Sequence, residues 1–411
     1  MTDPKKDAHN QSDGVVFYTG KTSPYLPQTE RRSDGAYHRV PPPKKNDYVP
    51  AAKSTHRKVR PIFNVISIIL SALLILSGSL CLVAYSYFNR INYANLSDAS
   101  DAGNSQKNPS TDDKVNAYNG TLLNDPMILN IMLFGADTRK GQDSGQSDTM
   151  ILFSIDTRHK KLKMLSLMRD TYVEVPGHEN NKINSSFFYG GASLAVQAVQ
   201  RNYGIKIDRY AVVDFKSFRN IIDTLGGIDV ELREEEIDYI NWQSWTNGQV
   251  DTRDEIDISS FEFHENEDGE YVTTVHLNGR QALWHARNRG QEGICSGDDY
   301  TRTLRQRTVM SILINRLKQS DLTTVMSIIY EIGPMITTNL KTSEITKLAT
   351  NITTYLKYDI VAKSAPEFDN FGIDFYYDSL WINGYALECI VIYDWNSFRK
   401  KVADFVFEGI Y

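Results

Sequence analysis

Residues 128–139 read I-L-N-I-M-L-F-G-A-D-T-R, an apolar run that ends in a glycine and is followed by charged residues. A short apolar run that stops at a turn residue is typical of a strand buried in a sheet. The sequence therefore predicts a buried strand at 128–134, with Asp137 and Arg139 placed just beyond its end.

The segments that follow this strand alternate between strand and helix patterns. Apolar runs at 150–155 and 162–167 predict a hairpin around 157–161. Further strands are expected at 210–214 and 228–232, and helices at 192–203, 216–225, 278–288, 299–318, 321–332, 343–356 and 395–407. The acidic segment 234–272 looks like an irregular insertion in which a hairpin is one alternative, and 368–411 is expected to add a strand or two to the same sheet. This mixture predicts a single three-layer α/β/α domain over 126–411, with a mixed central sheet covered by helices and a C-terminal extension at 343–411.

Arginines and aspartates gather in short clusters at the predicted ends of these elements. The clusters are G-A-D-T-R at 135–139, S-D-T at 147–149, R-D-T at 169–171, R-N-R at 287–289 and D-Y-T-R-T-L-R-Q at 299–306. Guanidinium groups bind phosphate oxygens in pairs, and nearby carboxylates can hold a divalent metal. A surface salt-bridge network uses the same residue types, but α/β folds build their sites at the ends of strands. The clusters therefore favour a metal-assisted diphosphate site.

The helix expected at 299–318 carries the clearest signal. Arg302 and Gln306 share one face with Met310, Leu313 and Leu317, because the spacing alternates between three and four residues. An arginine in line with a buried apolar stripe must be paired or bound, since an unpaired buried charge is expensive. The partial positive charge of the helix N-terminus adds to the attraction for an anion.

A membrane span is expected at 62–88, where no charged residue occurs. About 20 apolar residues cross a bilayer, and basic residues crowd the N-terminal side of this segment. The sequence thus predicts a disordered cytoplasmic tail at 1–60 and an extracellular linker at 91–125. The folded domain would lie outside a plasma membrane, held by a single span.

Charge and cysteine content narrow the possible partners. Residues 1–60 carry a net charge of +6 and the remainder −12, and an acidic ectodomain argues against nucleic acid as a partner. Cys295 and Cys389 both fall outside the predicted span, so either a disulfide or two free thiols is open.

The motifs, taken in order, resemble those of the LytR-CpsA-Psr family of bacterial cell-envelope proteins. The matching stretches, between about 126 and 320, are L-F-G-A-D-T-R (133–139), S-D-T-M-I-L (147–152), S-L-M-R-D-T (166–171), K-I-N-S-S-F (182–187), Y-A-V-V-D-F (210–215), D-T-L-G-G-I-D-V (223–230), L-N-G-R-Q-A-L (277–283), R-N-R (287–289) and D-Y-T-R-T-L-R-Q (299–306). The resemblance implies a transferase that moves a phosphorylated glycopolymer from a polyprenyl-diphosphate carrier to peptidoglycan, or to a cell-wall protein. Membrane lipid would be a further partner.

The resemblance also implies roles for single residues. Asp137 and Asp148 match the carboxylates that hold Mg²⁺ against the diphosphate. The diphosphate-binding groups implied by the family are Arg169, Arg287, Arg289, Arg302 and Gln306, with Arg139, Asp170, Lys182, Asp299 and Arg305 around them. Asp170 and Asp299 are both open as the group that accepts a proton from the attacking hydroxyl, with Arg169 beside them in the catalytic set.

The sequence departs from the family pattern in three places. Met168 replaces a proline, 234–272 is long and acidic, and the loop 290–297 brings Cys295 beside the site. These departures affect the choice of acceptor. Two other functions stay open: a membrane-bound sensor or attenuator that binds a lipid diphosphate, and a hydrolase that releases lipid phosphate to water.

Overall fold

A computed structural model describes residues 29–31, 37–39, 92–93, 114–137, 145–246, 254–370 and 372–409. The chain divides into two units, Met1–Leu73 and Leu74–Tyr411. In the first unit, β1 (Thr29–Arg31) pairs with β2 (Tyr37–Arg39) as a short antiparallel ladder. The membrane span expected at 62–88 lies outside the described residues. Within those residues, no helix combines the length and the apolar character needed to cross a bilayer.

The second unit is built around a seven-stranded mixed sheet. Its strand order is β14 (Asp359–Ala365), β6 (Lys161–Leu167), β5 (Ser147–Asp156), β4 (Ile128–Ala136), β9 (Arg209–Asp214), β13 (Thr337–Thr338) and β3 (Asn92–Tyr93). The central pairs β4–β5 and β5–β6 are antiparallel, whereas β14–β6 and β4–β9 are parallel. The expected mixed sheet is confirmed.

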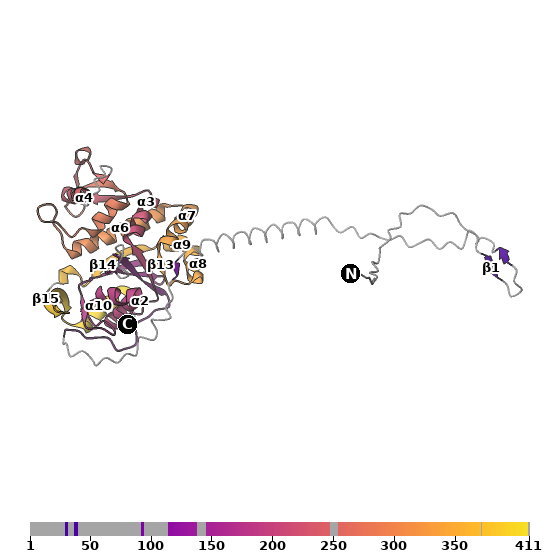
Figure 1. Cartoon of the computed structure of the whole chain (residues 1–411), viewed down its shortest axis with the longest axis horizontal. Helices are drawn as coiled ribbons and strands as arrows, with labels where there is room; N and C mark the ends of the chain where they lie inside the picture. The colour runs from indigo at the N-terminus through magenta and orange to yellow at the C-terminus, as the bar shows by residue number, and fades with distance from the viewer. Residues whose placement is uncertain are drawn as a thin grey trace, which may run out of the picture. The chain divides into compact units, whose positions relative to one another are not determined.

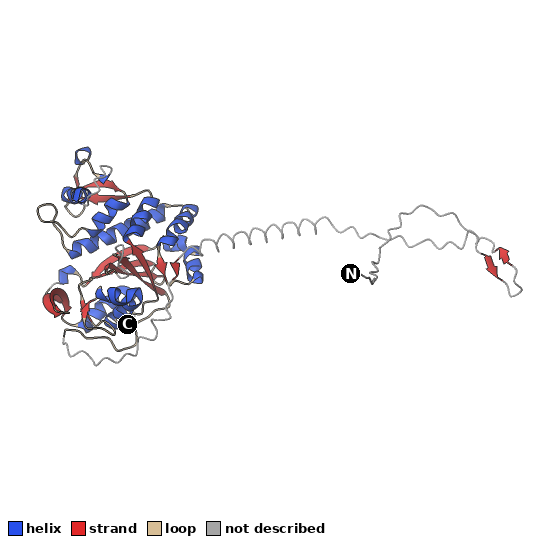
Figure 2. Ribbon diagram, in the orientation of Figure 1, coloured by secondary structure: helices blue, strands red, loops and turns tan. Residues whose placement is uncertain are grey.

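Helices cover both faces of this sheet (Figures 1 and 2). The helices are α2 (Ser185–Tyr203), α3 (Phe215–Thr224), α5 (Gly279–Arg287), α6 (Asp299–Gln319), α7 (Leu322–Ile332), α8 (Thr342–Thr350), α9 (Ile352–Tyr355) and α10 (Trp395–Phe407). Met132 and Phe134 of β4 pack in one core with α2 and α10. Ile131, on the opposite face of the same strand, packs in a second core with Ile314 of α6. Because side chains alternate between the faces of a strand, one apolar strand supplies both cores.

Two helices differ from their predicted bounds. Helix α2 begins seven residues earlier than the apolar pattern suggests, because the helical backbone breaks at Gly190-Gly191 and resumes. Gly191 has a φ of 62°, a conformation that glycine adopts without steric cost. The helix expected at 343–356 is split at Asn351 into α8 and α9.

The segment 234–272 is more regular than predicted. It contains α4 (Glu234–Thr246) and β11 (His264–Glu265), and it leads into β12 (Tyr271–Leu277), which pairs with β10 (Ile228–Leu232). Ile237 and Ile240 of α4 are buried against these strands in a separate core. The hairpin considered for this segment is present, because β11 pairs with the start of β12. Helix α4 was not predicted, because its apolar positions are few and its first turn is acidic.

The prediction that the C-terminal strands extend the main sheet was wrong. β15 (Phe375–Ile382) and β16 (Tyr385–Ile392) form their own antiparallel hairpin, which meets the domain through a bridge between Thr171 and Ile390. The strand that does extend the main sheet is β14, which pairs with β6 along its whole length and was not predicted. The helix expected at 395–407 is confirmed as α10.

Two further expectations concern the linker and the cysteines. Part of the linker expected at 91–125 belongs to the domain, since β3 pairs with β13, and Tyr118 donates its backbone N–H to Arg201. Cys295 and Cys389 are both buried and neither forms a disulfide, so of the two alternatives the structure has two free thiols.

Candidate functional site

One edge of the main sheet gathers the residues predicted to form the site. Asp137 directly follows β4, and Arg169 and Asp170 follow β6, the strand parallel to it. Asp148 lies in β5, where the pairing with β4 passes from Thr149 to Ser147 and leaves it without a partner. A β-bulge of this kind redirects a side chain, and bulges are frequent beside active sites.

Two helices complete the arrangement. α6 starts with Asp299 and carries Arg302 one turn later, and its N-terminus is closed by a capping box between Asp298 and Thr301. α5 ends at Arg287, after which the backbone is extended at Asn288. The arginine–aspartate cluster is the set Asp137, Asp148, Arg169, Asp170, Lys182, Arg287, Arg289, Asp299 and Arg302.

Asp148 and Asp299 are the two carboxylates at the centre of the cluster. Asp148 Oδ1 accepts a hydrogen bond from Arg169, and it lies 3.7 Å from Arg289 Nη2 and 3.9 Å from Arg302 Nη1. Asp299 Oδ1 lies 2.8 Å from Arg302 Nη2, 3.3 Å from Arg169 Nε and 3.6 Å from Arg289 Nε. The same three arginines therefore surround both carboxylates.

The remaining members of the cluster lie around this centre. Lys182 Nζ is 2.8 Å from Asp170 Oδ1, and Arg169 Nε is 3.5 Å from Asp170 Oδ2. Arg287 Nη2 is 3.7 Å from Asp137 Oδ2, and its guanidinium lies over the ring of Phe215 at 4.3 Å. That cation–π contact steadies an arginine whose side chain is 39% exposed.

The exposed fraction of the side chains increases across the cluster. Arg302 and Arg169 form its buried end, here called the floor, and Arg287 and Arg289 form its more exposed end, here called the mouth. The side chain of Arg302 is 1% exposed, those of Arg169, Asp148 and Asp299 are 15–18% exposed, and those of Arg287 and Arg289 about 40%. An anion entering from solvent would meet the long, partly exposed side chains of Arg287 and Arg289 first and the buried guanidinium of Arg302 last.

Arg302 is the least satisfied charged group in the cluster. None of its three guanidinium nitrogens has a hydrogen-bond partner in the described part of the chain, and the same holds for both carboxylate oxygens of Asp299. Their 2.8 Å contact is thus an ion pair without hydrogen-bond alignment. A buried polar group normally has its hydrogen bonds, so donors left in this state indicate a place for a ligand's acceptors.

Burial and charge shift the pKa values in this cluster in different directions. Burial raises the pKa of Asp299, and Arg302 and Arg169 only partly offset it. Burial would also raise the pKa of Asp148, but Arg169, Arg302 and Arg289 lower it. Burial lowers the pKa of Arg302 to about 10, so this guanidinium remains charged at neutral pH. The pKa values of two neighbouring carboxylates, Asp148 and Asp299, are therefore shifted in opposite directions, a pattern typical of functional sites.

Two residues expected to bind the diphosphate lie elsewhere. Arg305 Nε is 2.6 Å from Glu236 Oε1, and its Nη1 donates to the carbonyl of Asn288 at 2.9 Å. Gln306 Nε2 donates to the carbonyl of Ala286 at 3.2 Å. Both side chains reach the backbone that carries Arg287 and Arg289 and make no described contact with the cluster's carboxylates. Arg139 lies outside the described residues.

Sequence reasoning missed Glu236 and Phe215 as parts of this region. Glu236 lies in the segment taken as irregular, although three consecutive glutamates before an apolar residue are a helix-start signal. Nothing in the sequence indicates that Phe215 faces Arg287, since that contact depends on how α3 and α5 pack.

Asp137 and Asp148, the two carboxylates expected to hold magnesium, lie at the same edge of the sheet. Mg²⁺ is usually held by one or two carboxylates plus substrate phosphates, and Asp137 and Asp148 offer two carboxylates on adjacent strands. Within the described residues, three metal-ligating side chains meet only at Asp156, His159 and Glu408. There the ammonium of Lys163 already lies 2.6 Å from Asp156 Oδ2 and 3.1 Å from Glu408 Oε1, so that group is a buried ion-pair cluster.

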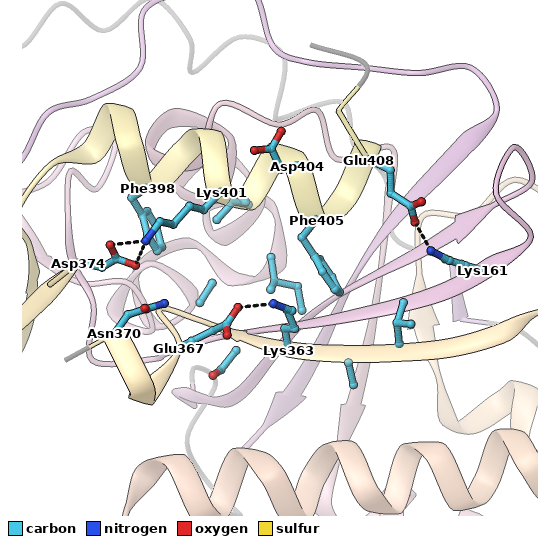
Figure 3. Close-up of a pocket in the computed structure, with 16 residues that line it drawn as sticks. Lys161, Lys363, Glu367, Asn370, Asp374, Phe398, Lys401, Asp404, Phe405 and Glu408 are labelled. Carbon is cyan, nitrogen blue, oxygen red and sulfur yellow. Dashed lines mark hydrogen bonds and ion pairs between the residues drawn. The ribbon is translucent and has the colours of Figure 1, made fainter.

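A separate cavity of about 740 Å³ lies between β14 and α10 (Figure 3). Its three lysines are each paired, Lys161 with Glu408, Lys363 with Glu367 and Lys401 with Asp374. No member of the arginine–aspartate cluster lines it. The positive charges of these lysines are neutralised within the protein, so the cavity lacks the unsatisfied cationic donors that distinguish the cluster.

Comparison with known proteins places the chain among a set of relatives. The sequence profile described as the LytR_cpsA_psr family matches residues 92–383. The chain is 31% identical over 280 residues to the polyisoprenyl-teichoic acid–peptidoglycan teichoic acid transferase TagV of Bacillus subtilis, which covers 66% of this chain and 62% of TagV. It is 36% identical over 143 residues to the regulatory protein MsrR of Staphylococcus aureus, which covers 35% of this chain and 39% of MsrR. The chain thus matches less than two thirds of the length of either relative.

A solved structure described as TagT bound to LIIa-WTA has the same fold. Its TM-score is 0.50 at 20% sequence identity, and the match covers 68% of this chain and 91% of that one. At this level of identity the likeness concerns the fold alone.

Proposed function

The chain belongs to the LytR_cpsA_psr family, and on that premise we propose that it is a membrane-anchored glycopolymer transferase. It would move a phosphorylated glycopolymer from a polyprenyl-diphosphate carrier to peptidoglycan, or to a cell-wall protein. The observation that carries the proposal is Arg302, a buried arginine whose three guanidinium nitrogens lack hydrogen-bond partners in the described structure. The similarity to TagV, a polyisoprenyl-teichoic acid–peptidoglycan teichoic acid transferase, supports the same reaction class.

The charges of the cluster suit a diphosphate. Five cationic side chains stand against four carboxylates, which leaves one net positive charge before any ligand or metal binds. Arg302 and Arg169 would hold the diphosphate at the floor, and Arg287 and Arg289 would close over it from the mouth. Phosphoryl transfer depends mainly on such positioning and neutralisation of charge.

Magnesium belongs to this proposal, with Asp137 and Asp148 as its protein ligands. When bound, Mg²⁺ would neutralise diphosphate oxygens and stabilise the charge that builds up on the leaving phosphate. The carboxylate of Asp148 suits this role because its lowered pKa keeps it ionised.

Asp299 is a better proton acceptor than Asp170 on geometric grounds. Asp170 is already paired with Lys182 at 2.8 Å, whereas Asp299, although its Oδ1 lies 2.8 Å from Arg302 Nη2, accepts no hydrogen bond from any described residue. Its raised pKa also brings it closer to the value at which a general base is effective.

The proposed reaction is a single displacement at phosphorus. An acceptor hydroxyl oxygen forms a bond to the phosphorus nearer the glycopolymer, and its proton passes to the Asp299 carboxylate. The bond from that phosphorus to the bridging oxygen breaks, and the polyprenyl monophosphate leaves. The cluster's arginines take up the charge that accumulates on this leaving group.

Anchoring completes the proposal. The uncharged segment 62–88 would hold the domain at the outer face of the plasma membrane, with residues 1–60 in the cytoplasm. A lipid-linked donor resides in the same membrane, so anchoring would bring the enzyme and its donor together.

A regulatory function is the second candidate, because MsrR is named a regulatory protein. In that case the cluster would bind a lipid diphosphate without turnover. A hydrolase that passes the glycopolymer phosphate to water is the third possibility.

One assay separates these functions. The full-length chain in detergent is given a lipid-diphosphate glycan labelled in its polymer, together with peptidoglycan and Mg²⁺. Label on the peptidoglycan supports transfer, soluble label supports hydrolysis, and saturable binding without turnover supports the regulatory function. The last two outcomes both contradict the proposed transferase.

A further inference from the structure

We propose that Glu236 and Arg305 are positioning residues, which hold Arg287 and Arg289 at the mouth of the arginine–aspartate cluster. This inference rests on the proposed function, because it assigns these two arginines to diphosphate binding. It concerns a buried ion pair that joins α4, α6 and the end of α5.

The segment that carries the two arginines has an alternating geometry. Asn288 is extended, with φ −64° and ψ 124°, and is fully buried. The side chains on either side of it point the other way, Arg287 toward Asp137 and Arg289 toward Asp148 and Asp299. The position of one buried peptide therefore determines where both guanidinium groups lie.

The backbone of this segment leaves helix α5 with carbonyl groups that need donors. The last carbonyls of a helix have no partner within it. Arg305 Nη1 donates to the carbonyl of Asn288 at 2.9 Å, and Gln306 Nε2 donates to that of Ala286 at 3.2 Å. Two consecutive residues of α6 thus hold the backbone on both sides of Arg287.

Arg305 can do this only because Glu236 compensates its charge. Arg305 is 5% exposed, and its Nε lies 2.6 Å from Glu236 Oε1. Glu236 Oε2 accepts in turn from the backbone N–H of Arg233 at 3.1 Å. A buried guanidinium without its carboxylate is strongly unfavourable, so Glu236 fixes where Arg305 points.

The neighbouring loop is held from the same helix. Ser296 donates its backbone N–H and its hydroxyl to the Glu235 carboxylate at 3.1 and 2.9 Å. Asn288 itself accepts from the N–H of Gly290 at 2.8 Å and donates to Cys295 Sγ at 3.4 Å. The first turn of α4 therefore makes two contacts with this region. Glu236 holds the arginine segment through Arg305, and Glu235 holds the following loop through Ser296.

The test compares Glu236→Gln with Glu234→Gln in the full-length chain in detergent. Glu234 is the exposed neighbour on the same helix turn and serves as the matched control. Gln keeps the size of the side chain and an acceptor oxygen but removes the charge. Two quantities are measured: hydrogen exchange of the backbone at 286–290, and the affinity for inorganic pyrophosphate with Mg²⁺.

Glu236→Gln is expected to speed exchange at 286–290 and to weaken pyrophosphate binding about tenfold, whereas Glu234→Gln changes neither. A double-mutant cycle with Arg289→Ala then distinguishes positioning from general loss of stability. If Glu236 acts through the arginines, its substitution has a much smaller effect once Arg289 is gone. If the two losses simply add, the role is only structural and the proposal is wrong.

The two readouts also separate this inference from the proposed function. Unchanged exchange at 286–290 in Glu236→Gln would overturn the positioning role even if the wild-type chain binds pyrophosphate. Failure of the wild-type chain to bind pyrophosphate would overturn the diphosphate site and, with it, the assignment of the two arginines to ligand binding. Should Glu236→Gln fail to fold, Arg305→Lys, which keeps the charge but loses the second donor, is measured in its place.

Discussion

Arg302 and Asp299 lie one turn apart on α6, with Nη2 and Oδ1 separated by 2.8 Å, yet neither group makes a hydrogen bond within the described structure. A buried ion pair is costly unless further hydrogen bonds satisfy its free donors and acceptors. The pair therefore keeps binding capacity at the floor of the cluster, and this capacity underlies the proposed diphosphate site.

Replacing Arg302 by alanine is expected to weaken binding of inorganic pyrophosphate about a hundredfold, because a desolvated charged contact is lost. Titration calorimetry on the full-length chain measures this. Arg307→Ala on the same helix is the control, since Arg307 contacts Thr303 and lies outside the cluster. Equal affinities in the two variants would remove Arg302 from the site.

The acid limb of the pH–rate profile should report Asp299. Burial raises its pKa above the ordinary 3.8, and a general base must be ionised, so activity falls as the pH drops through this raised value. Asp299→Asn should abolish this limb and slow transfer about 10²–10⁴-fold. Asp170→Asn should keep the limb. The reverse result would identify Asp170 as the base.

Magnesium dependence should shift when Asp148 is changed. Asp148→Asn removes the charge that would attract the cation, so about tenfold more Mg²⁺ is expected for half-maximal pyrophosphate binding. The exposed Asp238→Asn variant is the control. An unchanged Mg²⁺ requirement in Asp148→Asn would rule out this residue as a ligand.

Lys163 and Lys161 should differ sharply in their contribution to stability. Lys163 is 1% exposed and lies 2.6 Å from Asp156, which is fully buried. Lys163→Met leaves that carboxylate with only the His159 ring and the backbone N–H groups of Arg158 and His159 as partners, and should lower the free energy of unfolding by about 3 kcal/mol. Lys161→Met breaks a more exposed pair with Glu408 and should cost less than about 1 kcal/mol. Urea unfolding of both variants decides this.

His285 should make the fold sensitive to mild acid. Burial lowers its folded-state pKa to about 4, whereas 6.5 is the ordinary value expected in the unfolded chain. Between pH 4 and pH 6.5 the unfolded state binds more protons than the folded state. The contribution of neutral His285 to the free energy of unfolding is therefore fully present above pH 6.5 and is lost as the pH falls toward 4. The free energy of unfolding is expected to fall by an amount on the order of 3 kcal/mol between pH 7 and pH 4.

Unfolding free energies measured from pH 7 to pH 4 test this titration. His285→Phe should flatten the pH dependence, while the exposed His264→Gln should leave it as in the wild type. If His285→Phe retained the full slope, another group would be responsible.

Much of the fold was predictable because the apolar periodicities are local. The strands β4, β5 and β6 and the helices α5, α6 and α10 form within a few residues of their expected bounds. The buried position of Arg302 also followed from helical spacing alone, since it shares a face with Met310. These features depend on neighbours three or four residues away, which a sequence displays directly.

The sequence by itself determined the strands β4 to β6, the helices α5, α6 and α10, the charged residues at their ends and the family. Only the tertiary structure decided which arginines meet which carboxylates. Arg305 and Arg302 are three residues apart on one helix, yet one lies against Glu236 of α4 and the other against Asp299. The physical reason is that the partner of a buried charge comes from whichever element packs there, and packing between distant segments leaves no periodic pattern in the sequence.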